Sequence, residues 1–522
     1  MAKLQKLPVG IQSFEELRTN DYLYVDKTKD IFNLIDNGKV YFLSRPRRFG
    51  KSLLVSTLKE LFQGNKDLFE GLYIYDKWNW DEEYPIIHLD FSGRSYRDGE
   101  KLTNSLNIFL KRTAKLYGIE LEKTDLFADN FGILIEELYF KTRQKVVILI
   151  DEYDKPIVSN IKNSELDEIQ EILGDFYEVL KTNDQYIKFI FITGVSKFAH
   201  VSLFSKLNSL DDLTLVNEYN SICGYTQDEL EGNFKDHIKA LSIKYDCSIE
   251  KVLENLKFFY DGYSWNGLDK VYNPFSTLLC FRHLEFSKGW FNSGTPSVLA
   301  NHIISKSNIQ SLSEPVKLSK DDLTNPSTKV LKDEVLLFQT GYLTVSKKES
   351  QGLNTFYTLK IPNYEVETGL FQSLIEHYSA IPLSDVLNYG IDLTNYLIEG
   401  NCEKVKETIG DYLAPIPNVL RGDNEKYYHS LILILLLSSK QHVHSEIRRW
   451  KGNADIVIEE KDYVIILEFK HTKKTSIEYE IKNAFKQIEE QEYSRVYKNK
   501  KVIKAVIVFK DSAIGCKINK EQ

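Results

Sequence analysis

Residues 40–62 read VYFLSRPRRFGKSLLVSTLKELF, and this stretch decides the fold of the first part of the chain. Its apolar start predicts a short strand, its middle a turn, and its end an amphipathic helix. At the turn, Gly50, Lys51 and Ser52 form the closing GK[ST] of a phosphate-binding Walker A loop. A helix that begins there presents unpaired backbone N–H groups and the positive end of its dipole to phosphate. The stretch therefore predicts a nucleotide site.

The side chains of this loop have separate expected roles. Lys51 would reach the β- and γ-phosphates, and the hydroxyl of Ser52 would ligate Mg²⁺. The motif is incomplete, because Arg45 stands where the first glycine is expected. We therefore expect a turn geometry that differs from the standard loop. Arg47 and Arg48 add positive charge, and the sequence leaves open whether they contact phosphate or only decorate the loop.

A second motif follows about a hundred residues later, where residues 146–156 read VVILIDEYDKP. A buried strand that ends in carboxylates is the Walker B arrangement: Asp151 would hold Mg²⁺ through water, and Glu152 would polarise the attacking water. The alternative is a buried strand followed by a solvated acidic turn, which the upstream GKS disfavours. The next apolar run, KFIFITG, ends near Thr193, with Ser196 just after it. Either could be a polar sensor between the two motifs, or a structural cap.

The first 220 residues alternate apolar runs with helical periodicity, which predicts an α/β domain with a mostly parallel sheet. A helix is expected over Ser164–Thr182, where the apolar residues fall on one face. From about Gly224 the pattern turns helical, with a short β element around Val335–Val345. The loops FFYDGYSWNG and VYNPFS lie in this part, and the sequence assigns them no chemistry. The expected strands are Val40–Leu43, Ile86–Phe91, Val146–Ile150 and Phe189–Thr193.

A third motif lies near the end of the chain, where residues 444–472 read HSEIRRWKGNADIVIEEKDYVIILEFKHT. The pattern predicts a hairpin of Asp455–Ile458 and Tyr463–Phe469, followed by a strand at Lys501–Phe509. Glu468 and Lys470 are two residues apart and therefore share a face. A hairpin of this length places Asp455 near Glu468. Two converging carboxylates suit Mg²⁺ or Mn²⁺, which would polarise a phosphate and acidify an attacking water.

Other residues complete this expected site. Lys470 would orient the water or neutralise charge in the transition state. Glu446, expected on or at the end of a preceding helix, would be a further metal-site carboxylate. Gln487 lies on a helical run whose face could point back to the site, and Tyr493 ends that run. The D-x12-ExK spacing alone is unspecific, but the apolar run VIILEFK buries Glu468, and a buried charge requires a partner or a metal.

RPRRFGKS, LIDEYDKPI and FITGVSKF, with the opening LPVGIQSFEELR, resemble the AAA-ATPase-like proteins of bacteria and archaea that are fused to a PD-(D/E)XK nuclease domain. The resemblance covers nearly the whole chain, including YDGYSWNG, VYNPFS and FQTGYLT. It implies ATP binding and, by inference, hydrolysis, and it makes Arg45 an ordinary feature of the loop. One departure is Ala454, where the name-giving proline of the nuclease motif would stand; that proline is often absent.

The expected fold class is α/β, in three parts: a P-loop AAA-like ATPase domain with a parallel sheet over residues 1–222, a helical lid and connecting region over 223–420, and a restriction-endonuclease-like α/β domain over 421–522. The expected cofactors are ATP and Mg²⁺, or Mn²⁺ at the nuclease site.

Close to the expected nuclease site lies a basic cluster that would contact a phosphate backbone or simply be solvated. Its members are Arg495, Lys498, Lys500, Lys501 and Lys504.

Composition limits the environment. The net charge of −8 gives no global sign of nucleic-acid binding, although a basic groove can lie on an acidic protein. The five cysteines are scattered without CxxC pairing, which predicts reduced thiols and no zinc site. The N-terminus lacks the apolar stretch of a signal peptide, and the apolar run Leu431–Leu437 is far shorter than the ~20 residues of a membrane span. We therefore expect a cytoplasmic protein with no membrane partner.

Two functions compete at this stage. The first is an ATP-dependent or ATP-regulated nuclease whose partner is nucleic acid, DNA rather than RNA. The second is a nucleotide-switched interaction protein whose nuclease-like domain binds without cleaving, which the acidic charge and the lack of a DNA-reading motif favour. The joint presence of Asp455, Glu468 and Lys470 favours catalysis. A homo-oligomer is left open.

Overall fold

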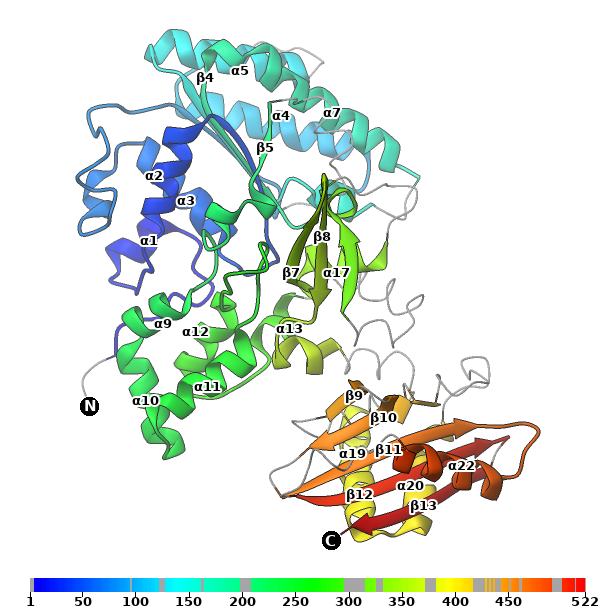
Figure 1. Cartoon of the computed structure of the whole chain (residues 1–522). Helices are drawn as coiled ribbons and strands as arrows, with labels where there is room; N and C mark the ends of the chain where they lie inside the picture. Colours follow the sequence, from blue (N-terminus) through cyan, green and yellow to red (C-terminus); the bar gives the residue numbers. More distant parts are fainter. Residues whose placement is uncertain are drawn as a thin grey trace. The chain divides into compact units, whose positions relative to one another are not determined.

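A computed structural model divides the chain into two compact units, and each unit is described by itself (Figure 1). The first comprises Met1–Gly294 and Pro315–Glu365, and the second comprises Thr295–Glu314 and Val366–Gln522. The division into three domains expected from the sequence remains a prediction. The structure describes residues 4–93, 96–121, 127–160, 164–197, 207, 209–294, 315–324, 332–370, 382–415, 428–429, 431–432, 435–436, 443–449, 452–459, 462–490, 500–511 and 513–521.

The first unit is built on a five-stranded parallel sheet of order β2-β3-β4-β1-β5. The strand β4 therefore lies between the two strands that carry the Walker-type motifs. The long strands read as nearly continuous apolar runs because both faces of a parallel sheet are covered. The strands are β1 Val40–Ser44, β2 Ile86–Asp90, β3 Val146–Asp151, β4 Ile187–Gly194 and β5 Asp211–Asp212.

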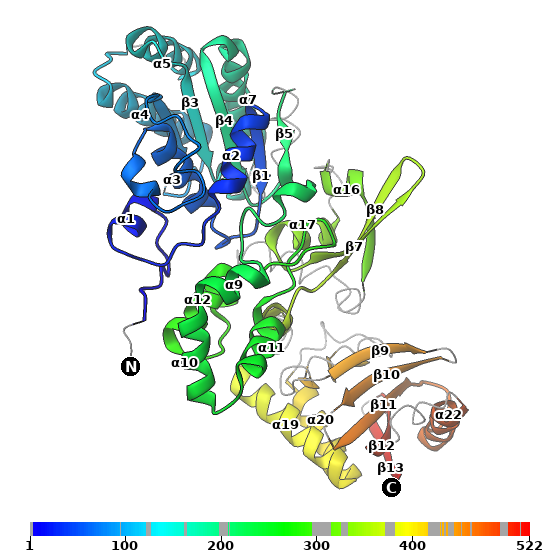
Figure 2. The ribbon, with the colours of Figure 1, turned by 60° about the vertical axis from the view of Figure 1, so that its left-hand side comes forward.

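Helices cover both faces of this sheet, as Figure 2 shows. On one face, α4 (Gly99–Leu116), α5 (Phe127–Thr142) and α7 (Leu166–Thr182) share a buried core with the strands, including stacked Phe131 and Phe176 rings whose centroids are 4.4 Å apart. On the other face lies α3 (Lys51–Phe62), against which α1 (Phe14–Thr19) packs. The helix α2 (Thr28–Asn37) precedes β1, and the short helix α6 (Lys155–Val158) packs on α7. The predicted parallel α/β sheet is confirmed.

The same unit contains the helical middle of the chain. Four helices, α9 to α12, pack around an apolar core that Leu23 and Val25 of the N-terminal segment also enter. A three-stranded antiparallel sheet of order β6-β8-β7 follows. These elements are α9 Gln227–Asn233, α10 Lys235–Tyr245, α11 Ile249–Tyr260, α12 Pro274–His283, α13 Gly289–Gly294, β6 Val316–Ser319, α16 Lys320–Thr324, α17 Asp333–Thr340, β7 Thr344–Gln351 and β8 Asn354–Lys360.

The β element expected around Val335–Val345 is wrong in its first part. Residues 333–340 form the helix α17, and strand β7 begins only at Thr344. Gly341, with a φ of 92°, ends the helix in the left-handed conformation that glycine adopts easily. The apolar run before it is buried along its whole length, so its periodicity does not distinguish a helix from a strand.

The second unit contains a mixed sheet of order β13-β12-β11-β10-β9, in which only β11 and β12 pair in parallel. Helix α22 (Ile477–Glu490) is the crossover between those two strands and covers one face of the sheet. Figures 1 and 2 show α19 (Leu383–Glu399) and α20 (Cys402–Leu413) on the other face. The strands are β9 Val443–Arg449, β10 Gly452–Glu459, β11 Tyr463–His471, β12 Lys501–Lys510 and β13 Ala513–Glu521.

The three strands predicted for this region are confirmed as β10, β11 and β12. The helix expected at Glu446 is wrong, because this residue lies in β9, where Ser445 pairs with Ile456 of β10. The segment forms a strand because its backbone pairs with β10, and a single sequence does not show such pairing. In the part of the chain that the structure describes, no helix combines the length and the apolar character of a membrane span.

Candidate nucleotide and nuclease sites

The loop between β1 and α3 has a defined backbone. Gly50 is the N-cap of α3 with a φ of 94°, in the left-handed region that favours glycine. The Nζ of Lys51, the first residue of the helix, donates to the carbonyl oxygens of Arg45 (3.0 Å) and Pro46 (3.1 Å). The loop thus curls around the ammonium group. An ammonium has three N–H donors, so these two contacts leave one for a ligand.

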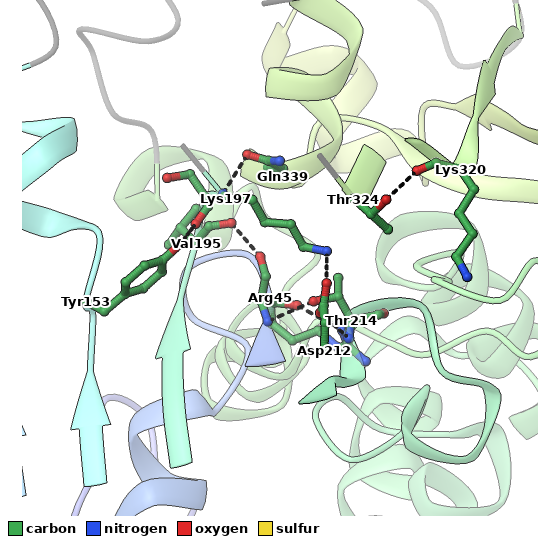
Figure 3. A network of polar contacts seen from close by, with 11 residues as sticks. Arg45, Tyr153, Val195, Lys197, Asp212, Thr214, Lys320, Thr324 and Gln339 are labelled. Atoms are coloured by element: carbon green, nitrogen blue, oxygen red, sulfur yellow. Dashed lines mark hydrogen bonds and ion pairs between the residues drawn. The ribbon is translucent and has the colours of Figure 1, made fainter. Parts of the chain in front are cut away.

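Arg45 ties the base of the loop to the rest of the domain. Its side chain is completely buried and donates to the carbonyl oxygens of Ser44 (2.8 Å), Thr214 (3.1 Å) and Tyr219 (2.8 Å) (Figure 3). The guanidinium carbon lies 3.9 Å from the ring centroid of Trp265. Burial lowers the pKa of Arg45 to about 10, so it stays charged at neutral pH. At the position of the missing glycine, the arginine is therefore an anchor for the loop and lies away from the ligand cavity.

A cavity of about 340 Å³ lies at the start of α3 and has a strongly cationic end. Gly50, Lys51, Ser52 and Glu152 all line it, so the structure brings these four predicted residues together. Among the described residues that line it, Glu152 is the only carboxylate, and five are cationic: Lys27, Arg47, Arg48, Lys51 and Lys155. Lys27 is paired with Glu229 at 2.7 Å, which leaves the charge concentrated at the loop.

The cavity also has an apolar lining. It is lined by the N-terminal segment, by residues 222–225 and by the start of α12, which are far apart in sequence. The volume falls within the ~300–1,000 Å³ typical of ligand pockets. A cavity lined by both cations and apolar side chains suits a molecule that joins phosphates to a planar base. The apolar lining residues include Pro8, Ile11, Leu23, Val25, Ile222, Phe275 and Leu278.

The carboxylates at the end of β3 have different surroundings. Asp151 is 4% exposed, and its Oδ1 accepts from the backbone N–H of Glu152 (3.0 Å) and from the hydroxyl of Thr193. Neither Asp151 nor Thr193 lines the cavity. Glu152 does, and its φ of 51° places a non-glycine residue in the left-handed region, where functional residues often occur. Burial raises the pKa of Glu152, and the nearby charge of Lys51 opposes that rise.

The two sensor candidates contact different carboxylates. Thr193 is the one bonded to Asp151, from the strand between β1 and β3. The backbone N–H and the hydroxyl of Ser196 both donate to Oδ2 of Asp154 at 2.7 Å. Asp154 is 3% exposed, so Ser196 satisfies a buried charge. Each of the two hydroxyls therefore satisfies a buried carboxylate, and Thr193 is the one that contacts the carboxylate of the second motif.

The loops to which the sequence assigned no chemistry pack on the phosphate-binding loop. The ring of Phe49 lies 4.7 Å from that of Tyr263 and 5.7 Å from that of Trp265, both in YDGYSWNG. The guanidinium of Arg48 lies over the ring of Phe275, in VYNPFS, at 4.9 Å. The enrichment of aromatic residues in these loops was the signal that the sequence offered for this packing. The sequence did not show the partner of the loops, because more than two hundred residues separate them from the phosphate-binding loop.

The FQTGYLT motif and α13 complete this packing. Trp290 donates its indole N–H to the carbonyl oxygen of Arg47 at 2.9 Å. Gln339, in α17, accepts from the backbone N–H of Lys197 at 3.0 Å. The Nζ of Lys197, a side chain that is 1% exposed, forms an ion pair with Asp212, as Figure 3 shows. The phosphate-binding loop and the segment after β4 are therefore both held by the helical middle.

In the second unit, four predicted side chains converge on the β10–β11 hairpin. Ile456 pairs with Leu467, which puts Asp455 beside Glu468, and Oδ2 of Asp455 accepts from the backbone N–H of Phe469 at 2.7 Å. Glu468 is 1% exposed. Its Oε1 accepts from Nζ of Lys470 (3.1 Å) and from Nε2 of Gln487 (2.6 Å). The predicted return of Gln487 from the helix to this site is confirmed.

The donor set fits a hard divalent cation, because Asp455 and Glu468 contribute adjacent carboxylates. Among the described side chains, no three histidine, cysteine, aspartate or glutamate residues gather into one metal-binding cluster. The side chain of Glu446 lies outside the described part, as does Tyr493. One neighbour was missed by the sequence: the ring Nε2 of His429 lies 3.0 Å from the backbone carbonyl oxygen of Asp455.

The basic cluster does not behave as one exposed run. Lys504 is 5% exposed within β12, and Lys500 is paired with Glu459 at 2.7 Å. Lys501 is exposed, whereas Arg495 and Lys498 lie outside the described residues. The alternation of a strand, which turns successive side chains to opposite faces, separates lysines that are close in sequence.

Comparisons with known proteins match both units. Residues 8–204 match the family described as a predicted AAA-ATPase, and residues 423–518 match the PD-(D/E)XK nuclease superfamily. The chain is 35% identical over 473 residues to a protein of Azotobacter chroococcum mcd 1 described as "Uncharacterized protein in vnfD 5'region". That alignment covers 89% of each of the two chains. The first family match contains the loop at residues 45–52, and the second contains the β10–β11 hairpin.

Proposed function

Because this chain belongs to the family in which a predicted AAA-ATPase domain is joined to a PD-(D/E)XK nuclease-superfamily domain, we propose that it hydrolyses ATP and cleaves phosphodiester bonds of DNA with a divalent cation. The observation that carries the nuclease half is the buried carboxylate of Glu468, which lies beside Asp455 and is held by Lys470 and Gln487. A charge buried in this way fits a site built for a cation.

In the first unit, the phosphates of ATP bind to the backbone of Gly50 and to Lys51, at the cationic end of the cavity. Ser52 would ligate Mg²⁺ and Asp151 would hold it through water, while Thr193 keeps the carboxylate of Asp151 in place. Glu152 polarises the water that attacks the γ-phosphate. Burial makes Glu152 a stronger base than an exposed glutamate. The adenine base of ATP packs against the apolar side chains that line the cavity.

In the second unit, Asp455 and Glu468 would hold Mg²⁺ or Mn²⁺, with Glu446 as the further ligand expected from the sequence. A divalent cation there would supply Lewis-acid chemistry, that is, polarisation of the scissile phosphate and a lower pKa of water. Lys470 orients that water and neutralises charge that develops in the transition state. Gln487 fixes the carboxylate of Glu468 through its amide N–H.

The test is cleavage of supercoiled plasmid by the purified full-length protein with Mn²⁺ or Mg²⁺, in parallel with EDTA. Asp455→Ala and Glu468→Ala should each abolish cleavage and leave ATP hydrolysis intact. Glu459→Ala is the matched control, since Glu459 lies on the same strand β10 but pairs with Lys500, and it should keep both activities. Cleavage that persists in EDTA, or in the double carboxylate variant, would refute the proposed nuclease site.

A second candidate is a nucleotide-switched protein that binds nucleic acid without cutting it. The burial of Lys504 and the pairing of Lys500 favour it, because they remove two cations from the expected backbone-binding run. The same plasmid experiment separates the two functions. A shift of the plasmid on a gel without nicking, at every metal concentration, would support the second candidate.

A further inference from the structure

Two thiols meet in the second unit, although 114 positions separate them in sequence. Cys402 is the first residue of α20, and Cys516 lies in β13, against which that helix packs. Their Sγ atoms are 3.1 Å apart, in an S–H···S contact, and both residues are half-buried. The other cysteines, Cys223, Cys247 and Cys280, belong to the first unit.

We propose that Cys402 and Cys516 form a reversible oxidation site, which closes to a disulfide by exchange with a low-molecular-weight disulfide such as glutathione disulfide. The thiolate of Cys402 attacks one sulfur of glutathione disulfide, which forms a mixed disulfide and releases one glutathione thiolate. The thiolate of Cys516 then attacks the Cys402 sulfur and releases the second. Two protein thiols are oxidised, the glutathione disulfide is reduced to two thiols, and the two protons pass to the released thiolates.

The local charges assign this order of attack. Cys402 is the first residue of α20, at the positive end of the helix dipole. Burial raises the pKa of Cys516, and the neighbouring Cys402 thiol raises it further. Lys406, one helical turn after Cys402, lowers that pKa, and Glu403 raises it; these two side chains pair at 2.6 Å. Cys402 is thus the attacking thiol, and Cys516 the resolving one.

The bond would have a structural effect that does not depend on the proposed function. It would join α20 to the edge strand β13, and the loop that it closes contains the whole β10–β11 hairpin, with Asp455 and Glu468. A cross-link over a loop of this length removes much of the conformational freedom of the unfolded chain. Oxidation should therefore make the second unit harder to unfold, and reduction should reverse the effect.

The experiment equilibrates full-length protein with glutathione disulfide or with dithiothreitol, blocks the remaining thiols in denaturant, and maps peptides without reduction. The oxidised protein should show a Cys402–Cys516 peptide within one chain. Its thiol count should fall from five to three, and its unfolding transition should rise by several degrees. Dithiothreitol should restore the reduced values.

Cys247→Ser is the matched control, because Cys247 is also half-buried but lies in the first unit, and it should keep the cross-linked peptide. Cys402→Ser should lose that peptide and the rise in unfolding temperature together. The proposal is overturned if the unmutated protein keeps five thiols, carries glutathione on both cysteines without a cross-link, or forms the bond between two molecules. The unmutated protein suffices for these readouts even if a variant fails to fold.

Discussion

Lys51 lies where the phosphate-binding loop and the cavity meet. The residue is 5% exposed, and its ammonium donates to two carbonyl oxygens of the loop. Lys51→Ala removes a charged donor to the phosphates. We expect ATP affinity to fall about 10- to 100-fold, the range for a hydrogen bond to a charged group. Lys59→Ala, on the same helix but paired with Glu60, should bind ATP normally. Equal affinities of the two variants, by calorimetry, would contradict the loop assignment.

Glu152 provides a test that separates binding from hydrolysis. Glu152→Gln should bind ATP as the unmutated protein does and hydrolyse it about 10²- to 10⁴-fold more slowly, because only general-base catalysis is lost. Since burial raises the pKa of Glu152, its carboxylate becomes protonated at a higher pH than an exposed glutamate. Hydrolysis by the unmutated protein should therefore fall as the pH decreases through that raised pKa. If Glu152→Gln hydrolyses ATP at the normal rate, another residue activates the attacking water.

Lys470 is expected to act on the reaction rather than on the metal. Its Nζ touches Glu468 at 3.1 Å, but an ammonium is not a metal ligand. Lys470→Ala should keep the Mn²⁺ affinity within a few-fold and lower the cleavage rate by about 100-fold or more. Lys510→Ala removes a lysine whose Nζ bonds to the carbonyl of Thr475, and should cleave normally. If Lys470→Ala loses Mn²⁺ binding, the role of Lys470 is to maintain the metal site and not to act on the reaction.

At the scale of elements, α17 ends against the phosphate-binding loop. A Cβ added to Gly341 would lie 2.7 Å from Cβ of Pro46, at a φ of 92°. Gly352, in the β7–β8 turn, has a φ of 63° and nothing within 4 Å of such a Cβ. Both alanine variants carry the cost of a left-handed conformation, about 1–2 kcal/mol. Only Gly341→Ala also displaces the loop.

We therefore expect Gly341→Ala to lower both the unfolding temperature and the ATP affinity, and Gly352→Ala to lower the unfolding temperature alone. Thermal unfolding and nucleotide titration of the two variants measure this difference. If both bind ATP as the unmutated protein does, the packing of α17 on the loop has no part in nucleotide binding.

At the scale of the molecule, a chain of contacts leads from the phosphate-binding loop to the end of the first unit. The indole N–H of Trp290 donates to Arg47 in the loop, and its backbone N–H donates to Glu365 at 2.8 Å. Glu365 also accepts from Ser276 at 2.9 Å, and Val366 begins the second unit. These hydrogen bonds form a continuous path from the loop to the residue where the chain leaves the first unit.

We expect nucleotide state to change DNA affinity by about 5- to 150-fold, the usual range of coupling between two sites. The measurement is DNA binding by Glu152→Gln with ATP, with ADP and with no nucleotide, at one salt concentration. Trp290→Phe in that background should reduce the difference. Trp80→Phe, which removes an indole bond to the carbonyl of Tyr75 instead, should not. Three equal DNA affinities would mean two independent modules.

The sequence alone predicted the features that depend on neighbours in the chain. The strand, turn and helix around Gly50, the carboxylates at the end of β3, and the position of Asp455 beside Glu468 all follow from periods of two or 3.6 residues and from the length of one hairpin. Local backbone geometry sets these placements. The same sequence therefore predicted both candidate sites and the parallel sheet that positions the first.

Only the tertiary structure decided what depends on distant neighbours. In the folded chain, Arg45 donates to Thr214 and Tyr219, and the YDGYSWNG loop packs on Phe49. The strand that contains Glu446 pairs with β10, and Cys402 contacts Cys516. Apart from the β9–β10 pairing, these contacts join residues more than a hundred positions apart, so no local period records them. Which buried surfaces meet is set by the packing of whole elements, where the gain from excluding water is shared among many side chains.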